Sequence, residues 1–355
     1  RSERPALGAG QTRTPADSDN DWMLPVITRP GVAPTGRLLS ACRDSGDGMI
    51  LGMDGFPFPT HWQLRTRRLE VLHPGGRLRR PLVMGIVNVT PDSFSDGGRH
   101  ADVEAAVAHG LALTDAGADL LDVGGESTRP FSDPVSAAEE LRRVAEVVRR
   151  LAGESGLPVS IDTSKAVVAA RAVELGAEII NDVTGLEGDP DMLAVARDTG
   201  VGICGMHMRG TPQTMQLDPH YGDVVGEIHD YLRSRRDILL AAGIPLDRIC
   251  LDPGIGFGKT HAHNLELMAH AAAFLDLGVP ILVGHSRKGF LGKLIEQTLG
   301  HAATEADRDA ATVGAACGLA AAGVHIVRVH AVGLVRLALE LFVATAPAHS
   351  AGLVK

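Results

Sequence analysis

The sequence predicts a (β/α)8 barrel, an α/β fold in which eight parallel strands alternate with eight helical segments. From about residue 61 to 346, short β-rich apolar runs alternate with longer stretches of helical periodicity. Aromatic residues make up only 3% of the chain, so small aliphatic residues must fill the core, as suits a parallel sheet covered by helices. A doubly wound open sheet is the alternative, but that fold rarely needs eight strand–helix repeats.

The individual elements follow this rhythm in order. A capping box, formed by Ser136 and Glu139, marks the start of the second helix. The predicted strands cover 82–89, 118–123, 157–162, 178–181, 201–206, 248–252, 280–284 and 324–329. The predicted helices cover 102–117, 136–153, 165–176, 189–199, 222–243, 262–277, 289–322 (with a break) and 332–346.

The composition changes near residue 60. Residues 1–60 are rich in Arg, Asp, Pro, Gly and Ser without any period, which predicts a disordered extension. A small folded module, or translated upstream sequence, are the alternatives, because the chain begins with Arg1 and its true start is open. Residues 61–346 form the predicted barrel domain, opening with a short hairpin over residues 61–80 that turns at His-Pro-Gly-Gly, and 347–355 form a tail.

Charge and hydropathy exclude several classes of partner. The net charge of −9 disfavours nucleic acid, although a local anion site needs only a few cations. The first twenty residues lack the apolar core of a signal peptide. The segment 311–329 contains His325 and Arg328 and is better explained as a buried helix, a turn and a strand than as a membrane span.

The four cysteines lie far apart and form no C-x-x-C pair. We expect them to be buried thiols in a reducing cytoplasm rather than disulfide or metal ligands. They are Cys42, Cys204, Cys250 and Cys317.

Polar residues stand at or just after almost every predicted strand. In a barrel of this type the carboxyl ends of the strands meet at one mouth, where active sites are built. A single Asp after a strand is often only a helix cap, and for Asp182 we favour that explanation. Polar groups from eight strands require a common partner, such as a bound ligand. They include Asn88, Asp122, Asp162, Asn181, His207, Arg209, Asp252, Ser286, Lys288, Arg328 and His330.

The chemistry of these groups indicates two parts of one ligand. A first set of three side chains supplies hydrogen-bond acceptors, and one of the three is an amide that can also donate. Such a set suits a flat heterocycle rich in N–H donors. The other three supply cations or donors suited to an anion such as phosphate. The first set is Asp162, Asn181 and Asp252, and the second is Arg328, His330 and Lys288.

Two other patterns do not meet their requirements. Residues 254–260 suggest a phosphate-binding loop, but its first glycine would fall on Pro253. The histidines at 261, 263 and 270 lack the i, i+4 spacing of a helical zinc site, so we expect them at the surface.

The segments that carry these residues resemble the signatures of dihydropteroate synthases, a family of pterin-binding barrels. They occur in the order typical of that family and cover residues 61–346. The matching segments read MGIVNVTPDSFSDGG from Met84, DLLDVGGESTRP from Asp119, SIDT from Ser160, INDV from Ile180, MHMRGTP from Met206, DPGIGFGK from Asp252, SRK from Ser286 and RVH from Arg328.

The resemblance implies that 6-hydroxymethyl-7,8-dihydropterin pyrophosphate and para-aminobenzoate condense to 7,8-dihydropteroate and pyrophosphate, with Mg²⁺ assisting. It also implies a cytoplasmic homodimer that is a target of sulfonamides. The pterin would be held by Asp162, Asn181, Asp252 and Lys288, and the pyrophosphate by Asn88, Arg328 and His330, with Asn88 near the metal. Loops bearing Phe94, Asp96, Thr128 and Arg129 would close over the site, Ser286 would border para-aminobenzoate, and Asp96, Asp162, Lys288 and Arg328 would act in catalysis.

The chain departs from the family pattern at two positions. Ala331 stands where the family usually has Asp after Arg-Val-His, which predicts the loss of a helix cap costing about 1 kcal/mol. Gly289 stands where Arg or Ser is common, beside the expected para-aminobenzoate pocket, so affinity there and the response to sulfonamides are open.

Two rival functions remain. A methyltetrahydrofolate methyltransferase-type barrel would share Asp162, Asn181 and Asp252 but would need no pyrophosphate site. A non-catalytic pterin-binding paralogue is the second rival, which the changes at Ala331 and Gly289 keep open.

Overall fold

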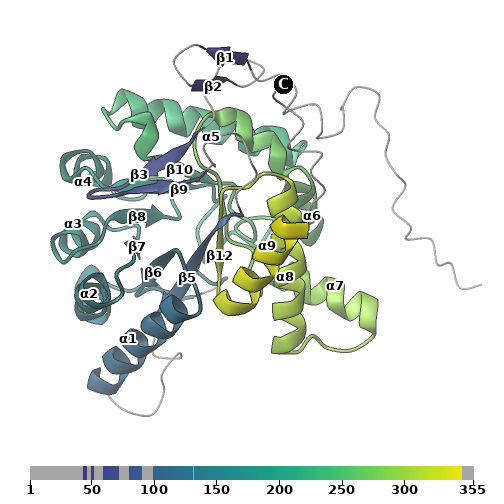
Figure 1. Ribbon diagram of the computed structural model, residues 1–355, viewed down its shortest axis with the longest axis horizontal. Helices are drawn as coiled ribbons and strands as arrows, with labels where there is room; N and C mark the ends of the chain where they lie inside the picture. Colours follow the sequence, from purple (N-terminus) through teal and green to yellow (C-terminus); the bar gives the residue numbers. More distant parts are fainter. Residues whose placement is uncertain are drawn as a thin grey trace, which may run out of the picture. The chain divides into compact units, whose positions relative to one another are not determined.

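The computed structural model describes residues 43–45, 49–51, 59–71, 80–89, 99–130 and 132–345. Its main sheet has eight strands in the order β10-β9-β8-β7-β6-β5-β12-β11, and every pair is parallel (Figure 1). A parallel bridge between Leu251 and Ile281 joins the two edges of this sheet. The predicted (β/α)8 barrel is therefore confirmed, and the open sheet is wrong.

The observed elements match the predicted ones closely. The break predicted within residues 289–322 separates α7 from α8, and the stretch 262–277 is α6 followed by the 3-10 segment η5 (Ala271–Leu277). The strands are β5 (Leu82–Asn88), β6 (Leu120–Gly124), β7 (Val159–Asp162), β8 (Ile179–Asp182), β9 (Gly202–Met206), β10 (Ile249–Asp252), β11 (Leu282–Val283) and β12 (Ile326–Val329). The helices are α1 (Arg99–Asp115), α2 (Ala137–Glu154), α3 (Ala166–Glu174), α4 (Met192–Thr199), α5 (Val224–Ala241), α6 (His261–Ala269), α7 (Gly289–Leu299), α8 (Glu305–Ala321) and α9 (Val332–Thr345), with a 3-10 turn, η4 (Leu246–Arg248), before β10.

The strands alternate between two apolar environments, because successive side chains point to opposite faces. One set, which includes Val83, Leu121 and Ile161, packs with the surrounding helices. The other set fills the barrel interior near the strand starts and includes Cys204 and Cys250, which are register partners in β9 and β10. These two thiols are buried and free as predicted, whereas Cys317 is only partly buried and Cys42 lies outside the described residues.

A hairpin of β3 (His61–Gln63) and β4 (Arg68–Glu70) closes the barrel at the strand starts. Trp62 is fully buried there and donates from Nε1 to the carbonyl of Arg248 over 3.0 Å. The predicted hairpin exists, but the predicted turn is wrong: the chain reverses at Leu64–Arg67, and His-Pro-Gly-Gly lies outside the described residues.

The carboxylate of Glu178 explains where this hairpin turns. It accepts hydrogen bonds from the backbone N–H and hydroxyl of Thr66, at 3.0 and 2.8 Å, and pairs with Arg67 at 2.7 Å. Since Glu178 directly precedes β8, a contact between distant segments fixes the turn, rather than the Pro-Gly signal.

The predicted capping box at the start of α2 is only half formed. The Ser136 hydroxyl accepts from the backbone N–H of Glu139, as predicted. The Glu139 carboxylate instead pairs with Arg142 and Arg143 at 2.5 and 2.8 Å, because two guanidinium groups on the next turn offer stronger charge-assisted bonds.

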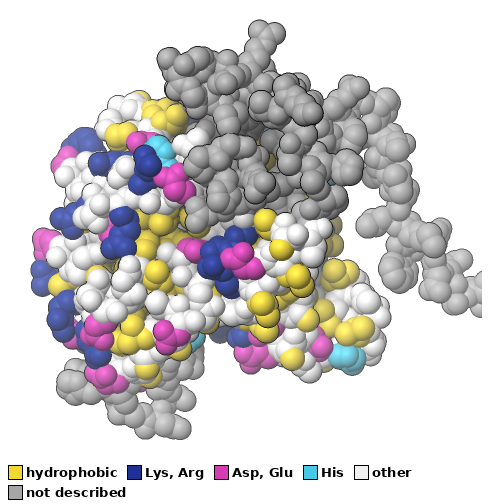
Figure 2. All heavy atoms as spheres, in the orientation of Figure 1, with side chains coloured by type: hydrophobic (Ala, Val, Ile, Leu, Met, Phe, Trp, Pro, Cys, Tyr) yellow, Lys and Arg dark blue, Asp and Glu magenta, His cyan; other side chains and the backbone are white. Residues whose placement is uncertain are grey.

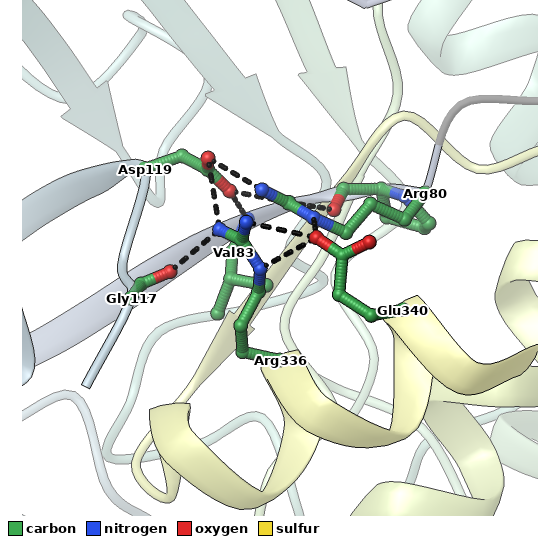
Figure 3. A network of polar contacts seen from close by, with 7 residues as sticks. Arg80, Val83, Gly117, Asp119, Arg336 and Glu340 are labelled. Carbon is green, nitrogen blue, oxygen red and sulfur yellow. Dashed lines mark hydrogen bonds and ion pairs between the residues drawn. The ribbon is translucent and has the colours of Figure 1, made fainter. Parts of the chain in front are cut away.

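An ion-pair network ties α9 to the strand starts (Figure 3). Asp119 receives two hydrogen bonds from the buried Arg80, at 2.6 and 2.9 Å, and one from the backbone N–H of Val83 at 2.8 Å. Arg80 also contacts Glu340, which pairs with Arg336 on the same helix. This end of a barrel serves stability rather than catalysis.

Replacing Asp119 by alanine should therefore lower the free energy of unfolding by about 3 kcal/mol, because it leaves Arg80 buried without its main counter-charge. Chemical denaturation would measure this loss. The control is Glu340→Gln, whose side chain is half exposed and should cost no more than about 1 kcal/mol. Equal losses in the two variants would contradict the assignment.

The remaining predictions about organisation fall partly outside the described residues. Within residues 1–60, β1 (Arg43–Ser45) and β2 (Met49–Leu51) pair in antiparallel fashion, and most of the other positions are not described. The segment 311–329 forms the end of α8, a turn and β12, as predicted. None of the helices in the described part of the chain has the length and apolar character needed to span a membrane.

Candidate active site at the carboxyl ends of the strands

The inward-facing positions change from apolar to polar along the barrel. In β12, for example, Ile326 belongs to the interior cluster, and the two-residue period then places Arg328 and His330 on the same side. In β6, the inward-facing residue likewise changes from apolar Leu120 to polar Asp122, two positions later. The polar residues at such positions are Asn88, Asp122, Asp162, Asn181, Asp252, Arg328 and His330.

Arg328 is the centre of this polar layer. It donates from Nε to Oδ2 of Asp122 at 2.6 Å and from Nη2 to Oδ2 of Asp162 at 2.8 Å. The amide of Asn181 also donates to Asp122, at 3.1 Å. Nη1 of Arg328 makes no hydrogen bond to any described residue, and the side chain is 20% exposed. Burial acts to lower the pKa of Arg328, but Asp122 and Asp162 outweigh it and raise the pKa, so the group stays charged.

Two groups in the mouth titrate near neutral pH. Burial raises the pKa of Asp162 to about 7, with Asp122 adding to the shift and Arg328 opposing it. Burial lowers the pKa of Lys288 to about 7, with Asp252 opposing the shift and Arg328 reinforcing it. Perturbed pairs of this kind are typical of functional sites.

Lys288 lies beside the loop that follows β10. Its Nζ contacts the carbonyl of Ile255 and stands 4.3 Å from the ring centroid of Phe257. Asp252, at the end of β10, is buried and accepts from the backbone N–H of Gly254 at 2.7 Å. Burial raises the pKa of Asp252 as well. Gly256 has a φ of 84°, and an added Cβ there would lie 2.7 Å from the Lys288 side chain, so the loop approaches the lysine closely.

Ser286 and His330 face each other where β11 and β12 end. The Ser286 hydroxyl lies 3.0 Å from Nδ1 of His330 and accepts from its backbone N–H at 3.2 Å. Burial lowers the pKa of His330 to about 4, and nearby Arg287, Arg328 and Arg129 contribute. His330 is therefore neutral at physiological pH, and the positive charge comes from the arginines.

Arg287 stands between two predicted site residues but points elsewhere. Its φ of 58° is unusual for a residue with a side chain. The guanidinium pairs with Asp309 on α8 at 2.7 Å, and its backbone N–H donates to Thr312 at 3.2 Å. This anchor turns Ser286 and Lys288 toward the mouth.

The remaining predicted site residues lie at the rim or outside the described chain. Asn88 ends β5, and no other described residue hydrogen-bonds its side-chain amide. Thr128 is partly buried, and Arg129 is exposed but close enough to affect His330. Phe94 and Asp96 lie outside the described residues.

Sequence reasoning gave too small a role to several residues. Asp122 is fully buried, bridges Arg328 and Asn181, and has a second oxygen, Oδ1, without a partner among the described residues. The position of Asp122 at the end of a predicted strand was the sequence signal for this role. Phe257 was inside a recognised motif, but only the fold shows that it lies against Lys288. Lys259 is buried and lies 3.0 Å from Nδ1 of His207, a contact between two loops that spacing cannot reveal.

The minor sequence predictions have mixed outcomes. Asp182 does have a local structural role, but it fixes the turn at Thr184 and Leu186; Asp191 takes the N-cap position of α4, without a capping hydrogen bond from its side chain. His261 and His270 are exposed as predicted, whereas the third histidine of that group, at 263, is partly buried and completes a capping box with Thr260.

Both departures from the family pattern lie at helix starts. The carbonyl of Ala331 accepts from Val335 at 3.1 Å, so Ala331 takes the N-cap position of α9 without a capping side chain. Gly289 begins α7, and an added Cβ would meet no atom of a described residue within 4 Å, so the described residues leave room for a side chain there.

Comparison with known proteins agrees with this geometry. The family model described as pterin binding enzyme matches residues 84–330. A dihydropteroate synthase of Neisseria meningitidis serogroup C is 46% identical over 256 residues, which are 71% of this chain and 88% of that protein.

Solved structures are similar over the same region. The dihydropteroate synthase of Xanthomonas albilineans with 4-aminobenzoic acid has a TM-score of 0.73 and 45% identity, covering 82% of this chain and 99% of that one. The structure of the same enzyme in complex with 7,8-dihydropteroate has a TM-score of 0.70 and 43% identity, covering 81% and 99%. From its barrel, its strand-end residues and these relatives, the chain belongs to the dihydropteroate synthase family of pterin-binding enzymes.

Proposed function

We propose that this chain condenses 6-hydroxymethyl-7,8-dihydropterin pyrophosphate with para-aminobenzoate to form 7,8-dihydropteroate and pyrophosphate. The observation that carries the proposal is Arg328, which is held by Asp122 and Asp162 and is close enough to Lys288 to help lower the pKa of that lysine. One mouth thus combines carboxylates for a donor-rich ring with cations for a diphosphate. The complexes of the Xanthomonas albilineans enzyme with 4-aminobenzoic acid and with 7,8-dihydropteroate support the same substrates.

The deep part of the mouth fits the pterin. Asp252 and Asp162 offer carboxylate acceptors, and the amide carbonyl of Asn181 offers another, while its NH2 group donates to Asp122. Lys288 supplies a donor beside Asp252. Asp122 Oδ1 is buried and has no partner among the described residues, and a bound heterocycle rich in N–H groups would satisfy acceptors of this kind.

The cations at the rim fit the pyrophosphate. Arg328, with Nη1 directed to no described residue, would bind phosphate oxygens and stabilise the charge that develops as the C–O bond breaks. Arg129 is close enough to add a second positive charge. Ionised Asp162 favours the positive charge that develops on the pterin methylene, and the amine of para-aminobenzoate then attacks without an activated Ser or Cys. Exclusion of water from the closed site would protect the electron-poor methylene.

The residues of the mouth are also compatible with Mg²⁺, which takes oxygen ligands and often relies on substrate phosphates. Asn88 offers an amide oxygen that no other described residue engages. No group of three or more His, Cys, Asp or Glu side chains within the described ranges is arranged as a metal site. Asn88 together with the pyrophosphate oxygens would therefore hold the ion. When bound, the ion would neutralise the leaving group's charge.

The test is pyrophosphate release by the purified full chain with the pterin pyrophosphate, Mg²⁺ and para-aminobenzoate. We expect release that requires para-aminobenzoate and yields dihydropteroate in equal amount. Pterin binding without release would instead support the non-catalytic paralogue. Methyl transfer from methyltetrahydrofolate would support the methyltransferase-type barrel. That reaction, however, needs no pyrophosphate site and so would not use the cations Arg328 and Lys288.

We further propose that the chain is a cytoplasmic homodimer, as the family resemblance implies. The outer face of α9 carries three exposed leucines at helical spacing, Leu334, Leu337 and Leu341, with exposed fractions of 56%, 71% and 63%. Hydrophobic side chains also reach the surface over α9 in Figure 2, whereas charged side chains of both signs alternate over α2 to α4. An apolar stripe of this kind is typical of a subunit interface.

Light scattering should therefore give a mass of twice the 37.2 kDa of one chain. Replacing Leu337 by aspartate should shift the population toward monomer, because it places a charge in the apolar stripe. The control is Val167→Asp on α3, which is also exposed but lies on another face. A monomeric wild-type chain would contradict the proposal.

A further inference from the structure

Beside the mouth, one lysine joins two carboxylates that the proposed reaction does not use. Nζ of Lys165 lies 2.6 Å from Oε2 of Glu126 and 2.6 Å from Oε2 of Glu140. Glu140 is fully buried on α2, while Glu126 and Lys165 are 20% and 24% exposed. We call these three residues the Lys165 triad.

The triad fixes the base of the loop between β6 and α2. The other oxygen of Glu126 accepts from the backbone N–H of Val135 at 2.7 Å, so one carboxylate joins both ends of the loop. Arg143 holds the carbonyl of Gly125 at 2.9 Å. Thr128 and Arg129, at the tip, form no comparable ion pair with the described residues.

The triad also connects this loop to the strand that bears Asp162. Lys165 follows Asp162 by three residues, and its backbone N–H donates to the hydroxyl of Thr163 at 3.2 Å. The backbone N–H of Thr163 in turn donates to the carbonyl of Asn181 at 3.0 Å. The position of Glu126 is therefore set relative to two residues of the pterin site.

Stability alone is a weak explanation for this arrangement. Two carboxylates share one ammonium group, and Oε1 of the buried Glu140 has no partner among the described residues. Desolvation of buried ion pairs usually offsets most of their attraction, so hydrophobic residues would serve stability equally well. What an ion triad adds is a defined position for the Glu126 carboxylate.

We propose that Lys165, Glu126 and Glu140 are positioning residues for the second substrate: they hold the loop of Thr128 and Arg129 over the mouth. Arg129 there is close to His330, which faces Ser286 at the expected para-aminobenzoate pocket. This inference rests on the proposed function. It assigns to the triad an effect on para-aminobenzoate use rather than on pterin binding, because the loop after β10 holds Asp252 and Lys288 without any contact to Glu126.

The test compares Glu126→Gln, Lys165→Met and Lys165→Arg in the full chain. Glu126→Gln retains an oxygen for Val135 but loses the charge, and we expect the KM for para-aminobenzoate to rise roughly tenfold to a hundredfold. Lys165→Met should have a similar effect. Lys165→Arg keeps the positive charge, so its KM for para-aminobenzoate should stay within about threefold of the wild-type value. The dissociation constant of a pterin analogue, measured by fluorescence, should change less than about twofold in all three.

Arg80→Met serves as the matched control, since Arg80 is a buried cation at the other end of the barrel. It should lower the melting temperature without raising the KM for para-aminobenzoate. Should Lys165→Met not fold, the variant Lys165→Met/Glu140→Gln removes the unpaired buried charge and tests the same point.

Two results would overturn the inference. One is an unchanged KM for para-aminobenzoate in Glu126→Gln and the folded Lys165 variants. The other is an equal weakening of pterin binding, which would indicate general structural damage. A wild-type chain without para-aminobenzoate-dependent release would instead contradict the proposed function itself, so the two failures are distinguishable.

Discussion

Replacing Arg328 by alanine should reduce the kcat for pyrophosphate release about a thousandfold, the range typical of a cation that stabilises a leaving phosphate. Two effects add. The variant loses the guanidinium that would bind the leaving group, and it removes the counter-charge of Asp122 and Asp162 in the mouth. Rapid-quench measurement of the chemical step would show whether the loss occurs there or in binding.

Arg336→Ala is the control for this variant. Arg336 also pairs with an aspartate and a glutamate, Asp119 and Glu340, but at the strand starts. The kcat of Arg336→Ala should stay within about twofold of the wild-type value, because Arg336 lies far from the mouth and shares no ion-pair partner with Arg328. If Arg328→Ala retained more than about a tenth of wild-type kcat, Arg328 would not be the main group that stabilises the pyrophosphate.

Much of the fold was predictable because it depends on local periodicity. The eight strands are short apolar runs, and the helices between them carry apolar stripes, so eight such repeats favour a barrel over an open sheet. The hairpin turn was not predictable for the opposite reason. Its position depends on Glu178, more than a hundred residues away, whose carboxylate binds Thr66 and Arg67.

The capping prediction at α2 shows the same limit on a smaller scale. The Ser136 bond forms because it depends on a residue three positions away. The reciprocal bond does not, because Arg142 and Arg143 compete for Glu139. A local motif gives a correct expectation only when no stronger partner lies nearby.

The location of the site was predictable from one rule, that parallel strands place their carboxyl ends at one mouth. That rule brings Asp162, Asn181 and Arg328 together from three separate motifs. The rule does not predict, however, which of these side chains form ion pairs or hydrogen bonds with one another. That Arg328 chooses Asp122 as well as Asp162, and that Lys165 joins Glu126 to Glu140, depends on side-chain directions that only the packed barrel defines.

Replacing Asp162 by asparagine should lower kcat/KM for the pterin pyrophosphate about a hundredfold and remove the acidic limb of its pH profile. Burial raises the pKa of Asp162 to about 7, so the carboxylate is protonated below neutral pH and ionised above it. If the ionised form favours the positive charge on the pterin methylene, wild-type kcat/KM for the pterin pyrophosphate should rise as the pH increases through about 7. Asparagine stays neutral at every pH and cannot supply that charge.

The alkaline limb provides an internal comparison. Lys288 loses its proton as the pH rises through about 7, since burial lowers its pKa to that value, so the wild-type profile should be bell-shaped with its maximum near neutrality. Lys288→Met should abolish the decline on the alkaline side and leave the acidic limb. Asp182→Asn is the control, because that carboxyl also has a raised pKa, about 6, but faces a turn rather than the mouth. An acidic limb that survived in Asp162→Asn would assign the titration to another group and contradict the role given to Asp162.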